Sequence, residues 1–289
     1  MIVFLNGQFV PESQAVVPVN DRGFLYGDGL FETVRVAGGR PFRLAQHLER
    51  MIRGLDFLKI PRPFGAPQLE DFAAQLIERN GMPEAVLRLA VTRGPGARGY
   101  APPANCRPTV VMTLHPAPVP DSLPAWSLIT ASYRIPAADP LASFKTLNKL
   151  PHVLARAEAI AGGADEALLI NTNGEVAETA GGNLFWVYQE EVCTAPSGRG
   201  VLPGITRAVV LEICQALGLP TSKRVIKPEA LRHSQGLFVA QSVFGIVPVI
   251  ALDGEPVPPS PLVDQIIRAY AEMLAGEQAS GPDKASGPV

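Results

Sequence analysis

The sequence has few of the residues that cross-link small secreted domains or bind metals. Its 289 residues include three cysteines, Cys106, Cys193 and Cys214, which are far apart and form no CxxC pair. The four histidines are equally dispersed, and neither set has the spacing of metal ligands. We therefore expect reduced thiols and no bound metal.

The sequence also lacks the features of nucleic-acid-binding, exported and membrane proteins. Its formal net charge is −2 and it has no Lys/Arg-rich run, which argues against nucleic acid or an anionic membrane as the main partner. The N-terminus has no basic segment before its short apolar run, and no apolar stretch approaches the roughly 20 residues of a membrane-spanning helix. We expect a cytoplasmic protein with a small ligand, since a small anion needs only a few local cations.

The composition provides enough apolar sequence for more than one domain. Hydrophobic residues make up 47% of the chain and charged residues 18%. Helical and strand patterns follow one another without regular βαβ alternation, which predicts an α+β protein and argues against a doubly wound sheet. We predict a smaller domain at 1–115, a Pro-rich linker at 116–125, a larger domain at 126–275 and a disordered tail at 276–289.

Hydrophobic periodicity and turn residues predict the secondary structure. Asn6-Gly7 fits the tight turn of an N-terminal hairpin, and Gly38-Gly39 suggests a second one. The predicted strands are 2–5, 9–10, 31–36, 41–44, 85–93, 109–114, 126–133, 166–171, 183–188, 236–241 and 246–250. The predicted helices are 44–58, 68–79, 204–217, 262–274 and one that begins just after Lys145, with the apolar stripe Leu147, Leu150, Leu154, Ala157 and Ala161.

A lysine near the middle of the chain is the first candidate for chemistry. Lys145 lies in the stretch 143–148, between a polar turn and a predicted helix. A lysine can bond covalently to a carbonyl cofactor if a partly desolvated setting lowers its pKa. Lys149 offers the same chemistry, and an ordinary surface lysine is the alternative for either. Spacing alone does not choose between them.

Two later segments supply what a lysine-bound pyridoxal 5′-phosphate (PLP) cofactor also requires. A buried carboxylate can keep the pyridine nitrogen protonated, and Glu178 and Glu175 are the candidates just before the small-residue loop 180–182. The helix start at 204–206 follows Pro203, and its free amides favour a phosphate. Each signal is weak alone, but the ordered set predicts a PLP site.

A glycine-rich loop is the candidate for substrate recognition. The segment 93–100 lacks the Gly-Lys-Ser/Thr ending of a P-loop and the fingerprint of a dinucleotide site. Arg98 and Tyr100 on this loop suit the recognition of a substrate carboxylate. A plain surface loop is the alternative.

Two N-terminal motifs complete the pattern. Residues 21–33 read Asp-Arg-Gly-Phe-Leu-Tyr-Gly-Asp-Gly-Leu-Phe-Glu-Thr, and residues 47–50 read His-Leu-Glu-Arg. With the lysine, glutamate and helix-start segments in this order, residues 4–249 resemble the fold-type IV PLP enzymes, the class IV aminotransferase family. The resemblance implies an α+β fold like that of D-amino acid aminotransferases, with a small α/β domain and a larger domain containing a pseudo-barrel.

The resemblance also implies roles for individual residues. It makes Lys145, and not Lys149, the lysine that binds the cofactor, and it pairs Glu178 with the pyridine nitrogen. The implied phosphate ligands are Arg50, the amides of Ile205 and Thr206, and the Ser242 hydroxyl. A homodimer is implied as well, in which a neighbouring subunit completes a site between the two domains.

Two activities compete within the family. The segments 93–103 and 241–248 resemble the 4-amino-4-deoxychorismate lyases most, and Phe31 points the same way because D-amino acid aminotransferases tend to have tyrosine there. We therefore expect a lyase that releases 4-aminobenzoate and pyruvate for folate synthesis, with Phe31 beside the substrate. Branched-chain aminotransferases share Phe31, and 202–210 fits an aminotransferase equally well, so a D-amino acid or branched-chain aminotransferase is the alternative. A non-catalytic PLP-binding protein ranks third.

Overall fold

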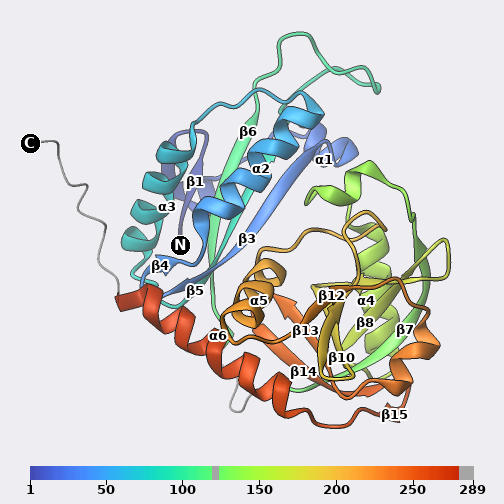
Figure 1. Cartoon of the computed structure of the whole chain (residues 1–289). Helices are drawn as coiled ribbons and strands as arrows, with labels where there is room; N and C mark the ends of the chain where they lie inside the picture. The colour runs from blue at the N-terminus through green and yellow to red at the C-terminus, as the bar shows by residue number, and fades with distance from the viewer. Residues whose placement is uncertain (119–123, 280–289) are drawn as a thin grey trace, which may run out of the picture.

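The chain folds into two β-sheets, each with its own helices (Figure 1). The computed structural model describes residues 1–118 and 124–279. All strands of the first sheet precede residue 117, and all strands of the second follow residue 125. No helix in these described ranges is long and apolar enough to cross a membrane. The predictions for 119–123 in the linker and 280–289 in the tail lie outside the described residues.

The first sheet has six strands in the order β2-β1-β6-β5-β3-β4, all paired antiparallel. The predicted N-terminal hairpin is confirmed: Asn6 and Gly7 have positive φ angles of 50° and 93°, which Asn and Gly tolerate best. The strands are β1 (Ile2–Leu5), β2 (Gln8–Pro11), β3 (Gly29–Ala37), β4 (Arg40–Pro41), β5 (Ala85–Thr92) and β6 (Thr109–Pro116).

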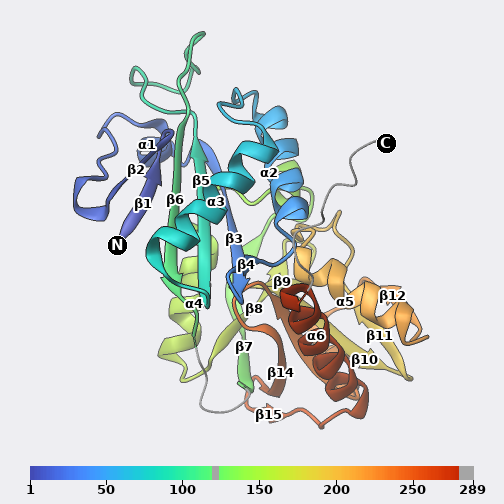
Figure 2. The same ribbon diagram turned by 90° about the vertical axis from the view of Figure 1, so that its left-hand side faces the viewer.

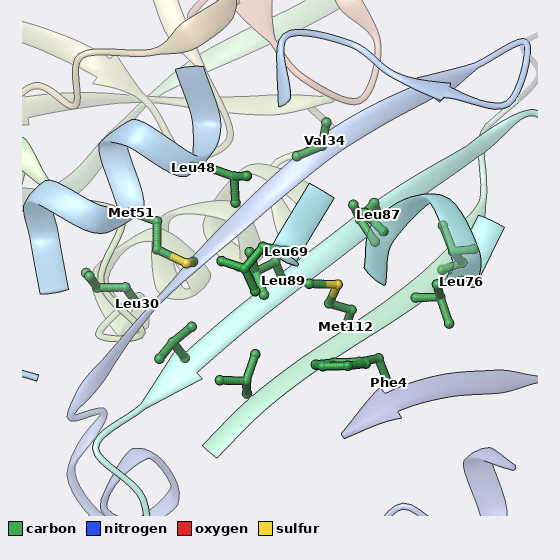
Figure 3. Close-up of a cluster of buried hydrophobic side chains, with 14 of the residues drawn as sticks. Phe4, Leu30, Val34, Leu48, Met51, Leu69, Leu76, Leu87, Leu89 and Met112 are labelled. Atoms are coloured by element: carbon green, nitrogen blue, oxygen red, sulfur yellow. The ribbon is translucent and has the colours of Figure 1, made fainter. Parts of the chain in front are cut away.

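Two helices cover one face of this sheet, α2 (Leu44–Leu58) and α3 (Ala66–Asn80) (Figure 2). Their apolar faces share one core with the inward side chains of the strands, as Figure 3 shows around Met51 and Leu89. Full burial of such a side chain stabilises the fold by about 1.5–3 kcal/mol. The core therefore fixes α2, which carries Arg50, against β3, which carries Phe31.

The second sheet has nine strands and curls into a half-barrel (Figure 1). Its order is β12-β11-β10-β13-β14-β7-β8-β9, with β15 paired to β14, and parallel and antiparallel pairs are mixed. The predicted α+β class is confirmed. The strands are β7 (Trp126–Ile135), β8 (Glu166–Asn171), β9 (Val176–Thr179), β10 (Asn183–Tyr188), β11 (Glu191–Thr194), β12 (Thr221–Lys223), β13 (Leu237–Gln241), β14 (Gly245–Leu252) and β15 (Glu255–Pro256).

Three helices pack on the second sheet. The crossover helix α4 (Leu150–Ala161) covers β7 and β8, and α5 (Ile205–Ala216) covers β13. The last helix, α6 (Pro261–Ala279), packs on α5 and β14 and extends to β3 of the first sheet (Figure 1). The short helices are α1 (Arg22–Tyr26), η1 (Glu12–Gln14), η2 (Pro140–Ser143) and η3 (Pro228–His233).

The helix expected just after the candidate lysine begins later and faces the other way. Leu147 precedes α4, and Pro151 occupies its first turn, where a missing N–H costs nothing. Small residues, Ala155 and Ala159, are buried against the sheet, whereas Leu150 is 67% exposed. The prediction was wrong because this helix lies close to the sheet on small side chains, which turns its larger apolar residues outward.

Two boundary predictions also need correction. The strand predicted at 41–44 ends at Pro41, because α2 already begins at Leu44. Residues 276–279 belong to α6 and not to a tail: Glu277 Oε1 lies 2.9 Å from Arg43 Nε at the start of α2. The short strands β9, β11, β12 and β15 and the short helix α1 were not predicted.

Candidate active site

The backbone of Lys145 is paired with the first sheet. The amide of Phe31 donates to the Lys145 carbonyl at 2.9 Å, and the amide of Leu147 donates to the Gly29 carbonyl at 3.0 Å. A side chain at Gly29 would collide with the Val91 carbonyl oxygen, which a Cβ would approach to 2.5 Å. Glycine is therefore required where this segment approaches β3, and the pairing places the lysine at the junction of the two sheets.

The Lys145 side chain lies over an aromatic ring in a setting that favours its neutral form. Its Nζ is 4.7 Å from the centroid of the Phe31 ring. Burial, and next the positive charge of Arg50, lower its pKa to about 8. A neutral amine is the nucleophilic form of lysine. The geometry therefore fits the covalent role expected of Lys145.

A cavity of about 630 Å³ joins Lys145 to Glu178. Its walls come from α4, from the ends of β8, β9 and β10, and from Phe31 of β3. The lining residues are Phe31, Lys145, Lys149, His152, Val153, Arg156, Ala157, Ile160, Glu166, Glu178, Thr179, Ala180, Gly181, Gly182, Asn183 and Leu202. The predicted lysine, glutamate and small-residue loop therefore lie around one cavity, and Glu175 is not among its lining residues.

Glu178 is buried at the end of β9. Its Oε2 accepts hydrogen bonds from the Leu202 amide at 2.9 Å and from Asn183 Nδ2 at 3.3 Å. Its Oε1 lies 3.4 Å from Nε2 of His152. A carboxylate held by these donors, with one oxygen less occupied, can accept the proton-bearing nitrogen of a pyridine ring.

Arg50 belongs to a buried cluster on the other side of the lysine. Its Nε and Nη2 donate to the two oxygens of Glu32 at 2.8 and 2.6 Å, and its Nη1 donates to the Pro203 carbonyl at 2.9 Å. His47 Nδ1 lies 2.7 Å from Glu32 Oε2. Burial alone would raise the pKa of Glu32, but the bonds from Arg50 and His47 hold it at about 2. This cluster fixes a guanidinium beside the start of α5.

The predicted phosphate site lies where α5 begins. The helix starts at Ile205 and has no side-chain cap, so its first amides are free for an anion. Glycine is needed at 204, because a Cβ there would lie 2.0 Å from Asn183 Oδ1. Thr206 is buried in the first turn. These features fit a phosphate group.

The turn that carries Ser242 approaches the same region. Ser242 follows directly after β13, in the turn between β13 and β14. A Cβ at Gly182 would lie 2.7 Å from the Ala240 carbonyl oxygen and 3.0 Å from Gln241 Cβ. The small-residue loop therefore contacts the end of β13, after which the Ser242 turn begins.

The structure does not bring Arg98 and Tyr100 to the cavity of their own chain. Both side chains are exposed, Tyr100 by 89%. Arg22 fixes their loop by hydrogen bonds: its guanidinium donates to the carbonyls of Gly99 and Tyr100 at 2.9 and 3.2 Å. The amide of Gly99 donates to the Tyr26 hydroxyl at 2.8 Å. The loop thus has a defined shape, and neither Arg98 nor Tyr100 lines the Lys145 cavity.

Sequence reasoning missed one cation beside the lysine. The guanidinium carbon of Arg88 lies 4.1 Å from the Phe31 ring centroid, and burial lowers the pKa of Arg88. No carboxylate pairs with Arg88 in the described part of the chain. A charged residue in the apolar strand 85–91 was the available signal.

Comparison with known proteins places this site in a family. The model of the family described as amino-transferase class IV matches residues 29–252. A Methanocaldococcus jannaschii protein, provisionally named a branched-chain-amino-acid aminotransferase, is 35% identical over 255 residues, which covers 88% of this chain and 88% of that protein. A D-alanine aminotransferase of Staphylococcus aureus is 30% identical over 272 residues, covering 88% of this chain and 90% of that one.

A solved structure agrees with this assignment. The 4-amino-4-deoxychorismate lyase of Pseudomonas aeruginosa has a TM-score of 0.83 and 33% identity, covering 95% of this chain and 98% of that one. The chain therefore belongs to the class IV aminotransferase family, the fold-type IV PLP enzymes. It is a PLP-dependent enzyme, and relatives with aminotransferase and lyase names are similar to it to comparable degrees.

Proposed function

We propose that this enzyme is a 4-amino-4-deoxychorismate lyase, which converts its substrate to 4-aminobenzoate and pyruvate. The supporting observation is a set of cations without ion-pair partners: Lys149 lines the Lys145 cavity, Arg88 stacks on its lining residue Phe31, and Arg98 lies on the exposed loop that would reach the cavity of a second copy. Arg88, Lys149 and Arg98 form no ion pair within the described residues. The lyase substrate has two carboxylates, whereas an aliphatic amino acid has one, so the lyase substrate makes fuller use of these cations.

PLP, when bound, acts as an electron sink for the charge left after a proton is removed beside the substrate nitrogen. Lys145 would hold the cofactor covalently and, once freed by the substrate amine, would remove the proton from the adjacent ring carbon. The enolpyruvyl C–O bond would then break, and the enolpyruvate that leaves would take up a proton to become pyruvate. Glu178 holds the pyridine nitrogen protonated. Lys145 finally assists the water that frees the aromatic product.

The proposed phosphate contacts surround the start of α5. The amides of Ile205 and Thr206 donate to the phosphate, and the Ser242 hydroxyl adds a further donor from the neighbouring turn. Arg50 contributes positive charge from α2, with its orientation fixed by Glu32. Because these groups belong to both halves of the chain, they would hold the phosphate at the junction of the two sheets.

Substrate carboxylates are assigned to Arg88 and to Arg98. Arg88 is placed by stacking on Phe31, within the same chain. Arg98 and Tyr100 are exposed and do not line their own cavity, so in this proposal they serve the site of a second copy in a homodimer. Support comes from the outer face of α4, where Leu150, Val153, Leu154 and Ile160 are exposed and would be covered by that copy. Val153 and Ile160 also line the cavity.

An aminotransferase of the branched-chain or D-amino acid type is the second candidate. The names of the curated relatives favour it. The cofactor contacts are the same in both reactions, because Lys145 is the general base in each. The two reactions differ because only the aminotransferase would return the proton to the cofactor carbon, and only the aminotransferase requires a keto acid.

Product analysis distinguishes the candidates. The PLP-loaded protein is mixed with 4-amino-4-deoxychorismate and no keto acid, and 4-aminobenzoate and pyruvate are measured per site. Many turnovers are expected for the lyase. Absence of aromatic product, together with conversion of the cofactor to its pyridoxamine form by a D- or L-amino acid, would establish an aminotransferase. If neither occurs although PLP can be reduced onto Lys145, the protein binds the cofactor without catalysis.

A further inference from the structure

The two oxygens of Glu178 have unequal surroundings. Oε2 already accepts from the Leu202 amide and from Asn183 Nδ2. Oε1 has His152 Nε2 as its neighbour at 3.4 Å, a distance at the long end for a hydrogen bond. Catalytic hydrogen bonds in unliganded sites are often long and tighten when the ligand binds. Oε1 is therefore the oxygen left for the pyridine nitrogen, and His152 shares it.

The second nitrogen of His152 defines which tautomer fits. Nδ1 is buried and has no hydrogen-bond partner among the described residues. A buried donor without an acceptor costs about 1–3 kcal/mol, and a protonated imidazole has a donor on each nitrogen. The neutral ring with its proton on Nε2 lowers this cost, because the atom left unpaired at Nδ1 is then an uncharged acceptor and not the donor of a cation. In this form Nε2 donates to Glu178.

The other charged groups near the pair are partly occupied elsewhere. Arg156, one turn along α4 from His152, lies 3.3 Å from Glu166 Oε2, and the Glu166 carboxylate also accepts from the Ala167 amide. Lys149 interacts electrostatically with Glu178, as does Lys145, but neither forms a hydrogen bond with it. His152 is therefore the side chain from α4 that contacts the carboxylate directly.

We propose that His152 is a positioning residue, which keeps Glu178 ionised and aimed so that the pyridine nitrogen of PLP retains its proton. The inference rests on the proposed function, in which Glu178 faces that nitrogen. A neutral donor stabilises the carboxylate without cancelling its charge, whereas a cation at the same place would compete with the protonated pyridine. Loss of the donor favours transfer of the shared proton from nitrogen to carboxylate.

The test measures the protonation of the pyridine nitrogen directly. The holoenzyme is reconstituted with PLP labelled with ¹⁵N in the ring, and the chemical shift of the nitrogen is measured by NMR. His152→Leu removes the donor at similar volume, and His152→Gln keeps one. We expect His152→Leu to shift the signal toward unprotonated pyridine and to lower kcat about tenfold, as for a change of about one pKa unit. His152→Gln should stay near the wild type, and His115→Leu, at an exposed site on β6, is the control.

Each outcome bears on the inference. An unchanged ¹⁵N shift in His152→Leu, or an equally shifted signal in His152→Gln, overturns the donor role; His152→Ala gives the same reading if the leucine variant does not fold. Glu178→Gln separates this failure from that of the proposed function. If it moves the signal and His152→Leu does not, only the role of His152 is wrong. If Glu178→Gln leaves the signal unchanged, the pairing of Glu178 with the pyridine nitrogen and the inference fail together.

Discussion

The two buried charge clusters on either side of Lys145 are built in opposite ways. In the cluster of α2 and β3, both oxygens of Glu32 accept hydrogen bonds from Arg50, and His47 contacts one of them. In the cavity, Lys145 has no ion-pair partner among the described residues, and Glu178 Oε1 has only a long contact with His152. The first cluster is buried and its carboxylate is saturated with hydrogen bonds, whereas the second lines a cavity and is not saturated.

This difference distinguishes charged groups that stabilise the fold from charged groups that remain available for catalysis. A saturated carboxylate has a low pKa and a fixed orientation, as Glu32 has with its pKa of about 2. An unpaired, desolvated amine has a lowered pKa and gives up its proton more easily, as Lys145 does with its pKa of about 8. Hydrogen-bond saturation therefore identifies which buried charges a ligand can engage.

The largest effect is expected at the unsaturated lysine. Lys145→Ala should lower turnover by a factor of about 10²–10⁴, the range for losing a general base, and should abolish the covalent bond to PLP. Borohydride reduction followed by peptide mass spectrometry checks the bond. Lys149→Ala is the matched control and should still be labelled at Lys145. Label on Lys149 in the wild type would contradict the assignment.

Substitution in the saturated cluster of Glu32, Arg50 and His47 should lower the stability of the fold. Glu32→Gln leaves Arg50 without its buried carboxylate, and breaking such a pair costs about 3–5 kcal/mol of unfolding free energy. Denaturant unfolding of the cofactor-free protein measures it. Glu84→Gln, which breaks the more exposed pair with Arg35, should cost less than about 1 kcal/mol. Equal losses in the two variants would argue against a special role for the buried cluster.

Acid titration of the same variants sharpens this prediction. The folded pKa of Glu32 is below its ordinary 4.5, so its contribution to stability is present above pH 4.5 and is lost as pH falls toward about 2. Glu32→Gln should therefore show a smaller loss of stability than the wild type between pH 4.5 and 2. A parallel decline of the two proteins would show that other carboxylates dominate.

Substitution of Arg88 tests whether a cation without an ion-pair partner, away from the cofactor, binds the substrate. Arg88→Leu should raise KM about 10- to 100-fold, because a charge-assisted hydrogen bond contributes about 1.5–3 kcal/mol. The free energy of unfolding should not fall, since the guanidinium pairs with no carboxylate in the described structure. Arg88→Lys should restore part of the affinity. A stability loss with unchanged KM would make Arg88 structural.

The smallest expected effect is a pH dependence. Capture of PLP by the cofactor-free enzyme needs neutral Lys145, so its rate should rise with pH and level off near 8 instead of near 10.5. Below the midpoint the rate should change about tenfold per pH unit. Stopped-flow absorbance measures it. Lys149→Ala should move the midpoint upward, because the charge of Lys149 helps to lower the Lys145 pKa.

The sequence predicted best where one local signal was strong. The apolar stripe of α2, the Asn6-Gly7 hairpin and the alternating strands of the first sheet are all present as expected. The association of Lys145 with Glu178 came from a resemblance and not from spacing. Nothing local in the sequence shows that a segment after η2 pairs with β3 and thereby brings the lysine toward the cavity.

What the sequence could not predict depends on tertiary packing. The sequence pattern suggests that Leu150 and Leu154 face the core. In the structure, α4 packs against the sheet through its alanines, so both leucines face outward. The contact between His152 and Glu178 joins residues 26 positions apart, on α4 and β9, and has no local signature. For Arg98, the loop shape is set by hydrogen bonds to Arg22 from a distant segment.

The pairing of Lys145 with β3 gives the cofactor a mechanical role. The lysine backbone is hydrogen-bonded to Phe31 of the first sheet, whereas Glu178 belongs to the second sheet. A molecule bonded to Lys145 at one end of its ring and held by Glu178 at the other is therefore a brace between the two halves of the chain. Loading with PLP should couple their unfolding into one transition, and rotation of one half against the other would act directly on the bond to be broken.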